Sequence, residues 1–194
     1  MLMPMDGRLV LLHGWGANGD DLKPLGDQLA RESSKTLDVV CLEAPELHPD
    51  QPGGRQWYGL FPAQWNAVPE AVDLLKAQLQ DQCRSGAGMK QTVVFGFSQG
   101  GAMALDCGCS LPIAGVISCS GYPHPNWVPP AQHPPVLLMH GDEDTVVPFQ
   151  AMQAIASQLQ SDRCHTLPFK NGHTIPEEMV QPILMFIERV LERL

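Results

Sequence analysis

One serine lies between two glycines, directly after a run of apolar and β-branched residues. The run is Thr92–Phe97, and it leads through Gly96-Phe97-Ser98-Gln99-Gly100 into small residues that favour a helix. A strand, a sharp turn and a helix in this order present a serine hydroxyl at the tip of the turn, in a strained backbone conformation. Glycine on either side lets strand and helix approach closely, because a Cβ there clashes. The pattern therefore predicts that Ser98 is a nucleophile.

A serine hydroxyl is a weak nucleophile until a base takes its proton, and a carboxylate orients that base. The most suitable histidine is His173, which follows a strand and precedes a helix in an open Gly-His-Thr loop. The unperturbed pKa of an imidazole is about 6.5, which suits a general base. His13 and His140 end apolar strands just before glycines, so we expect structural roles for them. The other histidines are expected in loops or at the surface: His48, His124, His133 and His165.

Three acidic residues compete for the carboxylate role, since Asp142, Glu143 and Asp144 follow the strand Val136–His140. They come after the serine and before the histidine, in a loop at the carboxyl end of a strand, where parallel α/β sheets build their sites. We predict Asp144, because the apolar residues of the next segment, Thr145–Pro148, are suited to hold the loop against the sheet. The alternative for each acid is that it only caps a helix.

A tetrahedral intermediate needs N–H donors for its oxyanion. The backbone N–H of Gln99, directly after the serine, is one predicted donor, and the loop after the first strand supplies the other. That loop is His13-Gly14-Trp15-Gly16, and we assign the second donor to Trp15. A glycine-rich turn before a helix also suits a phosphate. The sequence contains no G-K-[ST] motif, which disfavours this alternative.

Composition narrows the range of functions. The 194 residues, 44% hydrophobic and 17% charged, are typical of one globular domain spanning 1–194. A net charge of −9 argues against nucleic acid and anionic membranes as main partners. The chain shows no apolar run of membrane length and no leader-like start, so we expect a cytoplasmic protein without integral membrane association. The six cysteines, mostly in apolar segments, are expected to be free thiols, and no Cys/His spacing indicates a zinc site.

Apolar strands alternate with amphipathic helical segments, which predicts a mostly parallel sheet of about six strands with helices on both faces. We expect Asp20 or Asp21 to cap the first helix, which runs to about Ser33, and Pro182 to kink or split the last helix. No secondary structure is predicted for 44–67, and loops of this length are usually functional. The expected strands are Arg8–His13, Leu37–Glu43, Thr92–Phe97, Ala114–Cys119, Val136–His140 and Cys164–Phe169, and the expected later helices are Pro69–Cys83, Gln99–Cys109, Pro148–Gln160 and Pro176–Leu194.

The long segment 44–67 carries five large apolar residues that have two interpretations, Trp57, Tyr58, Leu60, Phe61 and Trp65. In the first, their side chains form the wall of an apolar pocket for the acyl part of a substrate. In the second, they fill the core beneath the loop. The sequence does not decide between the two.

Six motifs occur in a fixed order along the chain, from about Arg8 to the C-terminus. They are Leu12-His13-Gly14-Trp15-Gly16, Ala44-Pro45, Trp57-Tyr58, Gly96-Phe97-Ser98-Gln99-Gly100-Gly101, His140-Gly141-Asp142-Glu143-Asp144-Thr145-Val146-Val147-Pro148 and Gly172-His173-Thr174-Ile175-Pro176. Together they resemble the phospholipase/carboxylesterase family of small α/β-hydrolases, the group that includes acyl-protein thioesterases and lysophospholipases.

The resemblance implies an α/β-hydrolase fold without a separate cap domain, a Ser98–Asp144–His173 triad, an oxyanion hole from the backbone of Trp15 and Gln99, and no cofactor or metal. It implies hydrolysis of small-molecule carboxylic esters or thioesters, and a homodimer in some members. The family commonly has a smaller aliphatic residue at position 15, so we expect a narrower pocket here and short-to-medium acyl chains. The alternatives are a thioesterase or lysophospholipase for longer chains, a dienelactone-hydrolase-like enzyme or peptidase, and a non-catalytic binding protein.

Overall fold

A parallel sheet forms the centre of the computed structural model, which describes residues 5–84 and 86–192. The strand order is β2-β1-β5-β6-β7-β8, and every neighbouring pair is parallel. The predicted parallel α/β sheet is confirmed. Its strands are β1 (Gly7–Leu12), β2 (Leu37–Leu42), β5 (Thr92–Phe97), β6 (Gly115–Cys119), β7 (Val136–Gly141) and β8 (Cys164–Phe169).

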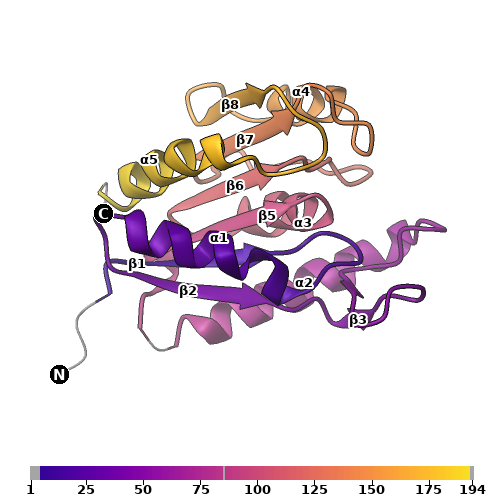
Figure 1. Ribbon diagram of the computed structural model, residues 1–194, viewed down its shortest axis with the longest axis horizontal. Coiled ribbons are helices and arrows are strands. Elements are labelled where there is room, and N and C mark those ends of the chain that lie inside the picture. Colours follow the sequence, from indigo (N-terminus) through magenta and orange to yellow (C-terminus); the bar gives the residue numbers. More distant parts are fainter. Residues whose placement is uncertain (1–4, 85, 193–194) are drawn as a thin grey trace.

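Helices cover both faces of the sheet (Figure 1). Helices α1 and α5 pack against one face, and α2, α3 and α4 pack against the other, each layer enclosing its own apolar core. The strands feed both cores because successive side chains alternate between faces. Leu9 and Leu11 of β1 point to the α1/α5 side, whereas Val10 and Leu12 point to the other. The helices are α1 (Gly19–Glu32), α2 (Val68–Gln82), α3 (Gln99–Gly108), α4 (Gln150–Ala156) and α5 (Val180–Leu191).

The order of winding reverses between β1 and β5. Strand β1 pairs with β2 on one side and with β5 on the other, so the connections leave these two strands in opposite directions. In open α/β sheets the crevice outside the carboxyl ends of the strands at such a reversal is the usual ligand site. The loop 13–18 follows β1 and Ser98 follows β5, so both predicted oxyanion segments lie at this crevice.

The structure corrects several local predictions. The N-cap of α1 is Asn18, whose side chain accepts the Asp20 N–H, while the Asp21 side chain accepts the Asn18 N–H; the predicted cap at Asp20 or Asp21 was wrong. Asn18 has the extended backbone that an N-cap requires, whereas the two aspartates are already helical. Pro182 lies in the first turn of α5, where no intrahelical partner is needed, and a 3₁₀ turn, Glu177–Met179, precedes the helix.

The long segment 44–67 has some secondary structure of its own, which the sequence did not indicate. Strands β3 (Glu46–Leu47) and β4 (Arg55–Gln56) form a short antiparallel hairpin, and Trp65–Ala67 forms a 3₁₀ turn that leads into α2. These strands are too short to show a period of two in the sequence. The hairpin lies beside the loop that follows β1, so this segment belongs to the surroundings of the site.

Two further expectations concern the whole chain. All six cysteines are free thiols, as predicted, and burial raises the pKa of Cys107, Cys109 and Cys119 to about 12, which makes these thiols unreactive at neutral pH. Among residues 5–84 and 86–192, none of the helices combines the length and apolar character needed to span a bilayer.

Candidate active site

The turn between β5 and α3 holds Ser98 in a strained backbone conformation, with φ 54° and ψ −117°. The flanking glycines make this turn sterically possible. A Cβ on Gly96 would lie 2.0 Å from the carbonyl oxygen of Gly100, and a Cβ on Gly100 would lie 2.2 Å from the carbonyl oxygen of Leu12. The Ser98 N–H donates to the Cys119 carbonyl at 2.9 Å, which ties the turn to β6. The predicted steric role of the glycines is confirmed.

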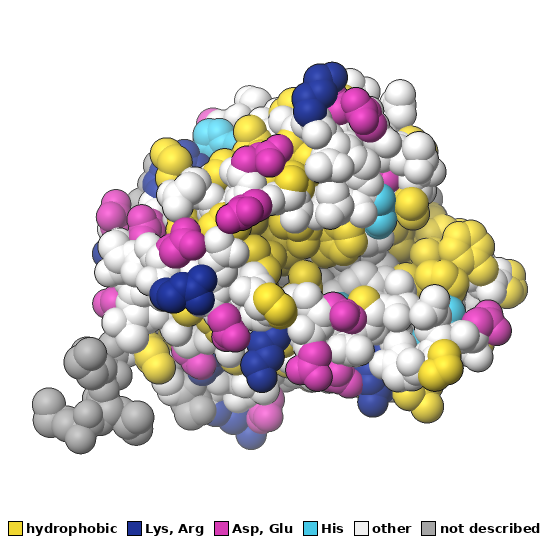
Figure 2. All heavy atoms as spheres, in the orientation of Figure 1, with side chains coloured by type: hydrophobic (Ala, Val, Ile, Leu, Met, Phe, Trp, Pro, Cys, Tyr) yellow, Lys and Arg dark blue, Asp and Glu magenta, His cyan; other side chains and the backbone are white. Residues whose placement is uncertain are grey.

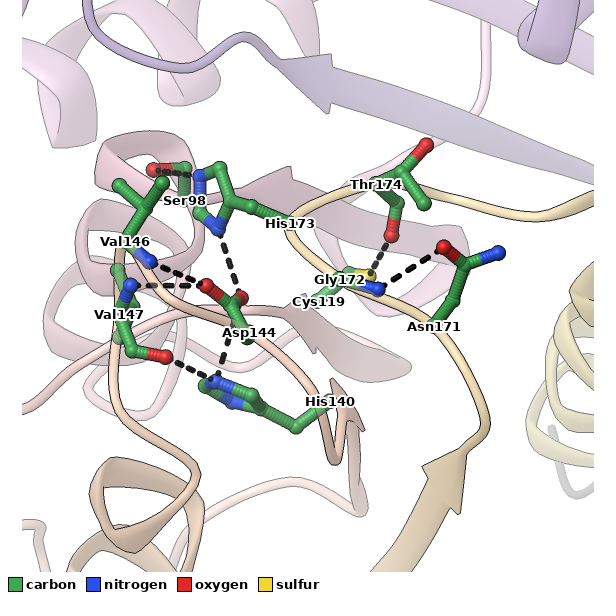
Figure 3. A network of polar contacts seen from close by, with 10 residues as sticks. All are labelled: Ser98, Cys119, His140, Asp144, Val146, Val147, Asn171, Gly172, His173 and Thr174. Atoms are coloured by element: carbon green, nitrogen blue, oxygen red, sulfur yellow. Dashed lines mark hydrogen bonds and ion pairs between the residues drawn. The ribbon is translucent and has the colours of Figure 1, made fainter.

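Ser98, His173 and Asp144 form a continuous hydrogen-bonded relay (Figure 3). The Ser98 hydroxyl donates to His173 Nε2 at 2.9 Å, and His173 Nδ1–H donates to Asp144 Oδ2 at 2.7 Å. A carboxylate only accepts hydrogen bonds, so the imidazole carries its proton on Nδ1 and Nε2 is free to accept. The His173 side chain is 17% exposed, and its ring packs on Phe97 with 4.8 Å between centroids. The imidazole is therefore both accessible and fixed.

The Asp144 carboxylate is fully buried and has a complete set of donors. Its Oδ1 accepts the backbone N–H groups of Val146 and Val147, each at 2.9 Å. Burial favours the neutral acid, but the hydrogen bonds from His173 and from these two amides outweigh it, so the pKa of Asp144 is lowered. The carboxylate is thus held ionised, as the orienting partner of an imidazole must be.

The two competing acids lie outside this relay. Asp142 pairs with Lys170 at 2.7 Å, and Glu143 is exposed. The apolar residues after Asp144 were expected to hold the loop against the sheet, and this is confirmed only in part. Val147 is buried, whereas Val146 is 66% exposed. The backbone amides of this turn, rather than apolar packing alone, hold the Asp144 side chain in place.

His13 and His140 are buried at the ends of β1 and β7 and form hydrogen bonds beneath the site, as expected. His13 Nδ1–H donates to the adjacent backbone carbonyl at 2.7 Å, and its Nε2 accepts the Ala44 N–H at 3.1 Å. Burial lowers the pKa of His13, so the ring is neutral. His140 Nε2–H donates to the Val147 carbonyl at 2.9 Å and lies 3.5 Å from Asp144 Oδ2. His140 thus holds the turn that carries Asp144, whereas His13 joins the loop after β1 to Ala44.

His48, His124 and His133 lie in loops, as expected, but are buried there, whereas His165 is an exposed residue of β8. Each buried ring bonds to polar groups of its own or a neighbouring loop. His48 Nδ1 accepts the N–H groups of residues 50 and 51, and His133 Nε2 accepts the N–H of residue 160. A histidine in a loop is buried when the loop folds over it, and the sequence carries no periodic signal for this.

The two predicted oxyanion donors come from segments that face each other. Gln99 is the first residue of α3, so its N–H is one of the helix-terminal amides without an intrahelical acceptor. The loop after β1 lies against the nucleophile, since a Cβ on Gly14 would lie 3.3 Å from the Ser98 Cβ. Within the described residues, backbone hydrogen bonds occupy the N–H groups of Gly16 and Ala17 but not that of Trp15. The assignment of Trp15 and Gln99 as donors stays a prediction.

The predicted substrate-binding aromatics differ from one another in burial. Trp57 and Tyr58 are 2% and 0% exposed and pack in the core on the α2/α3 side, which fits the alternative that they fill space beneath the loop. Neither lines the groove beside His173. Phe61 is 75% exposed and meets Trp15 edge to face, with 5.2 Å between ring centroids. A contact of Phe61 with substrate stays a prediction.

A groove of about 560 Å³ opens directly beside His173. Figure 2 shows hydrophobic side chains along a hollow across the middle of this face of the molecule. The sequence carries no local signal for this groove, because residues of α1 meet the segment 173–180 there only in the folded chain. Trp15 is not among its lining residues, so the Trp15 ring does not narrow it. Its apolar lining includes Leu22, Pro24, Leu25, Phe97, Ile175 and Val180, and its polar lining includes His13, Asp21, Gln28 and Glu177.

Comparisons with known proteins agree with this site. The model of the phospholipase/carboxylesterase family matches residues 3–191. The chain is similar to acyl-protein thioesterase 1 of Saccharomyces cerevisiae, with 26% identity over 98% of this chain and 95% of the relative, and to the carboxylesterase SOBER1 of Arabidopsis thaliana, with 26% identity over 95% and 90%. Among solved structures, esterase PE8 superposes with a TM-score of 0.86 and 31% identity, covering 96% of this chain and 94% of the other.

The relay at the carboxyl ends of the strands, the six-stranded parallel sheet and the match over nearly the whole chain are three independent observations that agree. The fold is that of the α/β-hydrolases. The chain belongs to the phospholipase/carboxylesterase family.

Proposed function

We propose that this protein is a serine hydrolase that cleaves carboxylic esters of small molecules through a Ser98–Asp144–His173 triad. The observation that carries the proposal is the relay from the Ser98 hydroxyl through His173 to Asp144, with its two hydrogen bonds of 2.9 and 2.7 Å. This arrangement supplies a nucleophile, a base in the correct tautomer and a buried anion that stabilises the imidazolium once it forms.

Acylation begins when Ser98 Oγ attacks the ester carbonyl carbon and His173 Nε2 takes the hydroxyl proton. The carbonyl oxygen becomes an oxyanion, and the N–H groups of Trp15 and Gln99 donate to it. His173 then returns the proton to the departing alcohol, which leaves an acyl-enzyme on Ser98. In the second half, His173 activates a water that attacks the acyl carbon, and the acid is released. A positioned base contributes about 10²–10⁴ in rate, and each oxyanion donor about 3–4 kcal/mol.

The acyl group lies in the groove between α1 and the segment 173–180. Apolar side chains such as Leu22, Leu25 and Ile175 supply contacts for short-to-medium acyl chains. The carboxylates of Asp21 and Glu177, which also line the groove, repel acyl groups that carry a negative charge. Trp15 does not line this groove, so the chain-length preference depends on the groove residues and not on the Trp15 ring.

A second candidate, thioester hydrolysis or lysophospholipid hydrolysis with longer acyl chains, is favoured by two observations. Several relatives carry the name acyl-protein thioesterase 1, and the groove is open rather than a closed pocket. The same triad serves both reactions, because a thiolate leaves more readily than an alkoxide.

The enzyme acts in the cytoplasm, in keeping with six free thiols in a reducing compartment. The resemblance implies that some family members are homodimers. The oligomeric state of this chain can be measured by light scattering.

The test is hydrolysis of p-nitrophenyl esters from acetate to palmitate by the wild type and by Ser98→Ala. We expect turnover that is highest for short-to-medium chains and is lost in the variant, with the thermal unfolding curve unchanged. Unchanged turnover in Ser98→Ala overturns the proposal. A maximum at palmitate supports the long-chain candidate. Labelling of Ser98 by a fluorophosphonate without ester turnover indicates a serine hydrolase that cleaves a bond other than a carboxylic ester. Absence of both turnover and labelling contradicts the enzyme assignment.

A further inference from the structure

Four consecutive residues of the long loop, Arg55–Tyr58, bond to both segments that carry the predicted oxyanion donors. On the side of β1 the contact is between backbones. The Gly16 N–H donates to the Arg55 carbonyl at 2.8 Å, and the Arg55 N–H donates to the Ala17 carbonyl at 2.8 Å. This reciprocal pair fixes the two residues that follow Trp15 to the hairpin strand β4.

The Trp15 side chain is held by the same strand. Its indole Nε1–H donates to Gln56 Oε1 at 2.9 Å, and Gln56 Nε2–H donates in turn to Glu46 Oε2 at 2.9 Å. Gln56 is 8% exposed, so water does not compete freely for these bonds. On the other side of the indole, His48 meets the ring edge to face with 4.1 Å between centroids. The ring of Trp15 therefore points into the hairpin and anchors the position of its own backbone.

The next two residues of the loop bond to Gln99. The Trp57 N–H donates to Gln99 Oε1 at 3.1 Å, and Gln99 Nε2–H donates to the Tyr58 carbonyl at 2.8 Å. The Gln99 side chain is fully buried and uses both ends of its amide on the backbone of this loop. The Trp57 indole donates to the His13 carbonyl at 2.9 Å, so Trp57 bonds to both oxyanion segments.

Tyr58 is anchored from the far side by a buried polar network. Its hydroxyl donates to His124 Nε2 at 2.9 Å, and His124 Nδ1–H donates to Asp106 Oδ2 at 2.7 Å. The Tyr122 hydroxyl lies 2.7 Å from that of Tyr58 and donates to it. Burial raises the pKa of Tyr58, so the hydroxyl keeps the proton that it donates. The loop is thus fixed at both ends of the Arg55–Tyr58 segment.

We propose that Arg55–Tyr58 is a clamp that sets the separation of the Trp15 and Gln99 amides, with Gln56 and the Gln99 side chain as positioning residues. The inference rests on the proposed function, because it assumes that these amides bind the oxyanion. Oxyanion donors act only when they are aligned in advance with the position of the developing charge, and a shift of about 1 Å costs on the order of 100-fold in rate. The clamp removes the freedom of two separate segments to drift apart.

Two variants test the clamp without removing either backbone donor. Gln56→Leu deletes the bond to the Trp15 indole, and Gln99→Met deletes both bonds to the loop at nearly constant side-chain volume. We expect kcat to fall by roughly 10- to 100-fold with KM nearly unchanged, since acylation and deacylation both pass through an oxyanion. Affinity for a trifluoromethyl ketone, which forms an oxyanion on the serine, should fall by the same factor. Gln51→Leu, an exposed glutamine of the same loop, is the matched control and should behave as the wild type.

The outcomes separate this inference from the proposed function. Ser98-dependent turnover with unaltered kcat and ketone affinity in both variants overturns the clamp but keeps the esterase. A rise in KM at constant kcat also overturns it, because it indicates a role in substrate binding only. A changed pH profile of kcat/KM also overturns the clamp, because it indicates that the variants alter His173 and not the oxyanion donors. If Gln99→Met does not give a cooperative thermal transition, Gln56→Leu and Tyr58→Phe, which leave the elbow intact, decide the question.

Discussion

Replacement of Asp144 by asparagine is the sharpest perturbation of the relay, because its effect follows from the hydrogen bonds of one side chain. The N–H groups of Val146 and Val147 require an oxygen at the position of Oδ1. The amide NH₂ of an asparagine must then face His173 Nδ1, and it can only donate. The imidazole proton therefore moves to Nε2, which can no longer accept from the Ser98 hydroxyl.

The expected loss in kcat for this wrong tautomer is about 10⁴-fold, which corresponds to about 5 kcal/mol of transition-state stabilisation. The fold should be retained, because the carbonyl oxygen of the asparagine still satisfies both amides of the turn. The assay is the steady-state hydrolysis of a p-nitrophenyl ester, with thermal unfolding followed by circular dichroism in parallel. Saturation with substrate separates kcat from KM.

Two neighbouring acids provide the controls, since Asp142→Asn and Glu143→Gln make the same chemical change outside the relay. Asp142 pairs only with exposed Lys170, and Glu143 is exposed, so kcat should remain that of the wild type. The reasoning is refuted if Asp144→Asn loses less than about tenfold in kcat while folded, or if Asp142→Asn shows the large loss instead.

The remaining predictions concern pH. First, the pKa of Asp144 is lowered in the folded protein, so this carboxylate should stay ionised down to about pH 5 and should cause no loss of kcat/KM above that pH; an acid-side loss of kcat/KM that is present in the wild type and absent in Asp144→Asn would contradict this. Second, the folded-state pKa of His13 lies below its unfolded value of about 6.5. Below that pH the unfolded chain therefore binds more protons than the folded chain. As the pH is lowered, the free energy of unfolding should fall by up to about 1.4 kcal/mol per pH unit until the pH reaches the folded-state pKa of His13. Urea unfolding of the wild type and of His13→Gln measures this, and an equal slope in both would exclude His13 as the cause.

The parts of the site that the sequence predicted depend on local rules. The steric demand for glycine around Ser98 is set within a few residues, and the distances from Gly96 and Gly100 to neighbouring carbonyls show why. The apolar runs of the strands identify their own carboxyl ends, where His173 and the acidic residues of 142–144 follow. Because parallel strands bring these ends to one edge, chain order was enough to predict that the three residues of the proposed triad lie together.

The sequence decided less where the outcome depends on segments that are distant in the chain. Three acids within 142–144 look equivalent in sequence, and only the turn that directs two backbone amides at Asp144 separates them. Aromatic residues such as Trp57 and Tyr58 occur both in pocket walls and in cores, so their type does not distinguish the two. The fold buries them against α2 and α3. The helix cap at Asn18 and the burial of His124 depend likewise on backbone conformation and loop packing.

The sequence by itself therefore determined the α/β sheet and the positions of Ser98 and His173, the proposed nucleophile and base, after two of its strands, because hydrophobic period and steric exclusion act over short distances along the chain. Tertiary structure alone decided the groove between α1 and the segment 173–180, and the hydrogen bonds through which Arg55–Tyr58 joins the two oxyanion segments. The physical reason is directional. A hydrogen bond between a side chain and a distant backbone group requires an alignment that packing of the whole domain creates, and no local pattern of residue types encodes it.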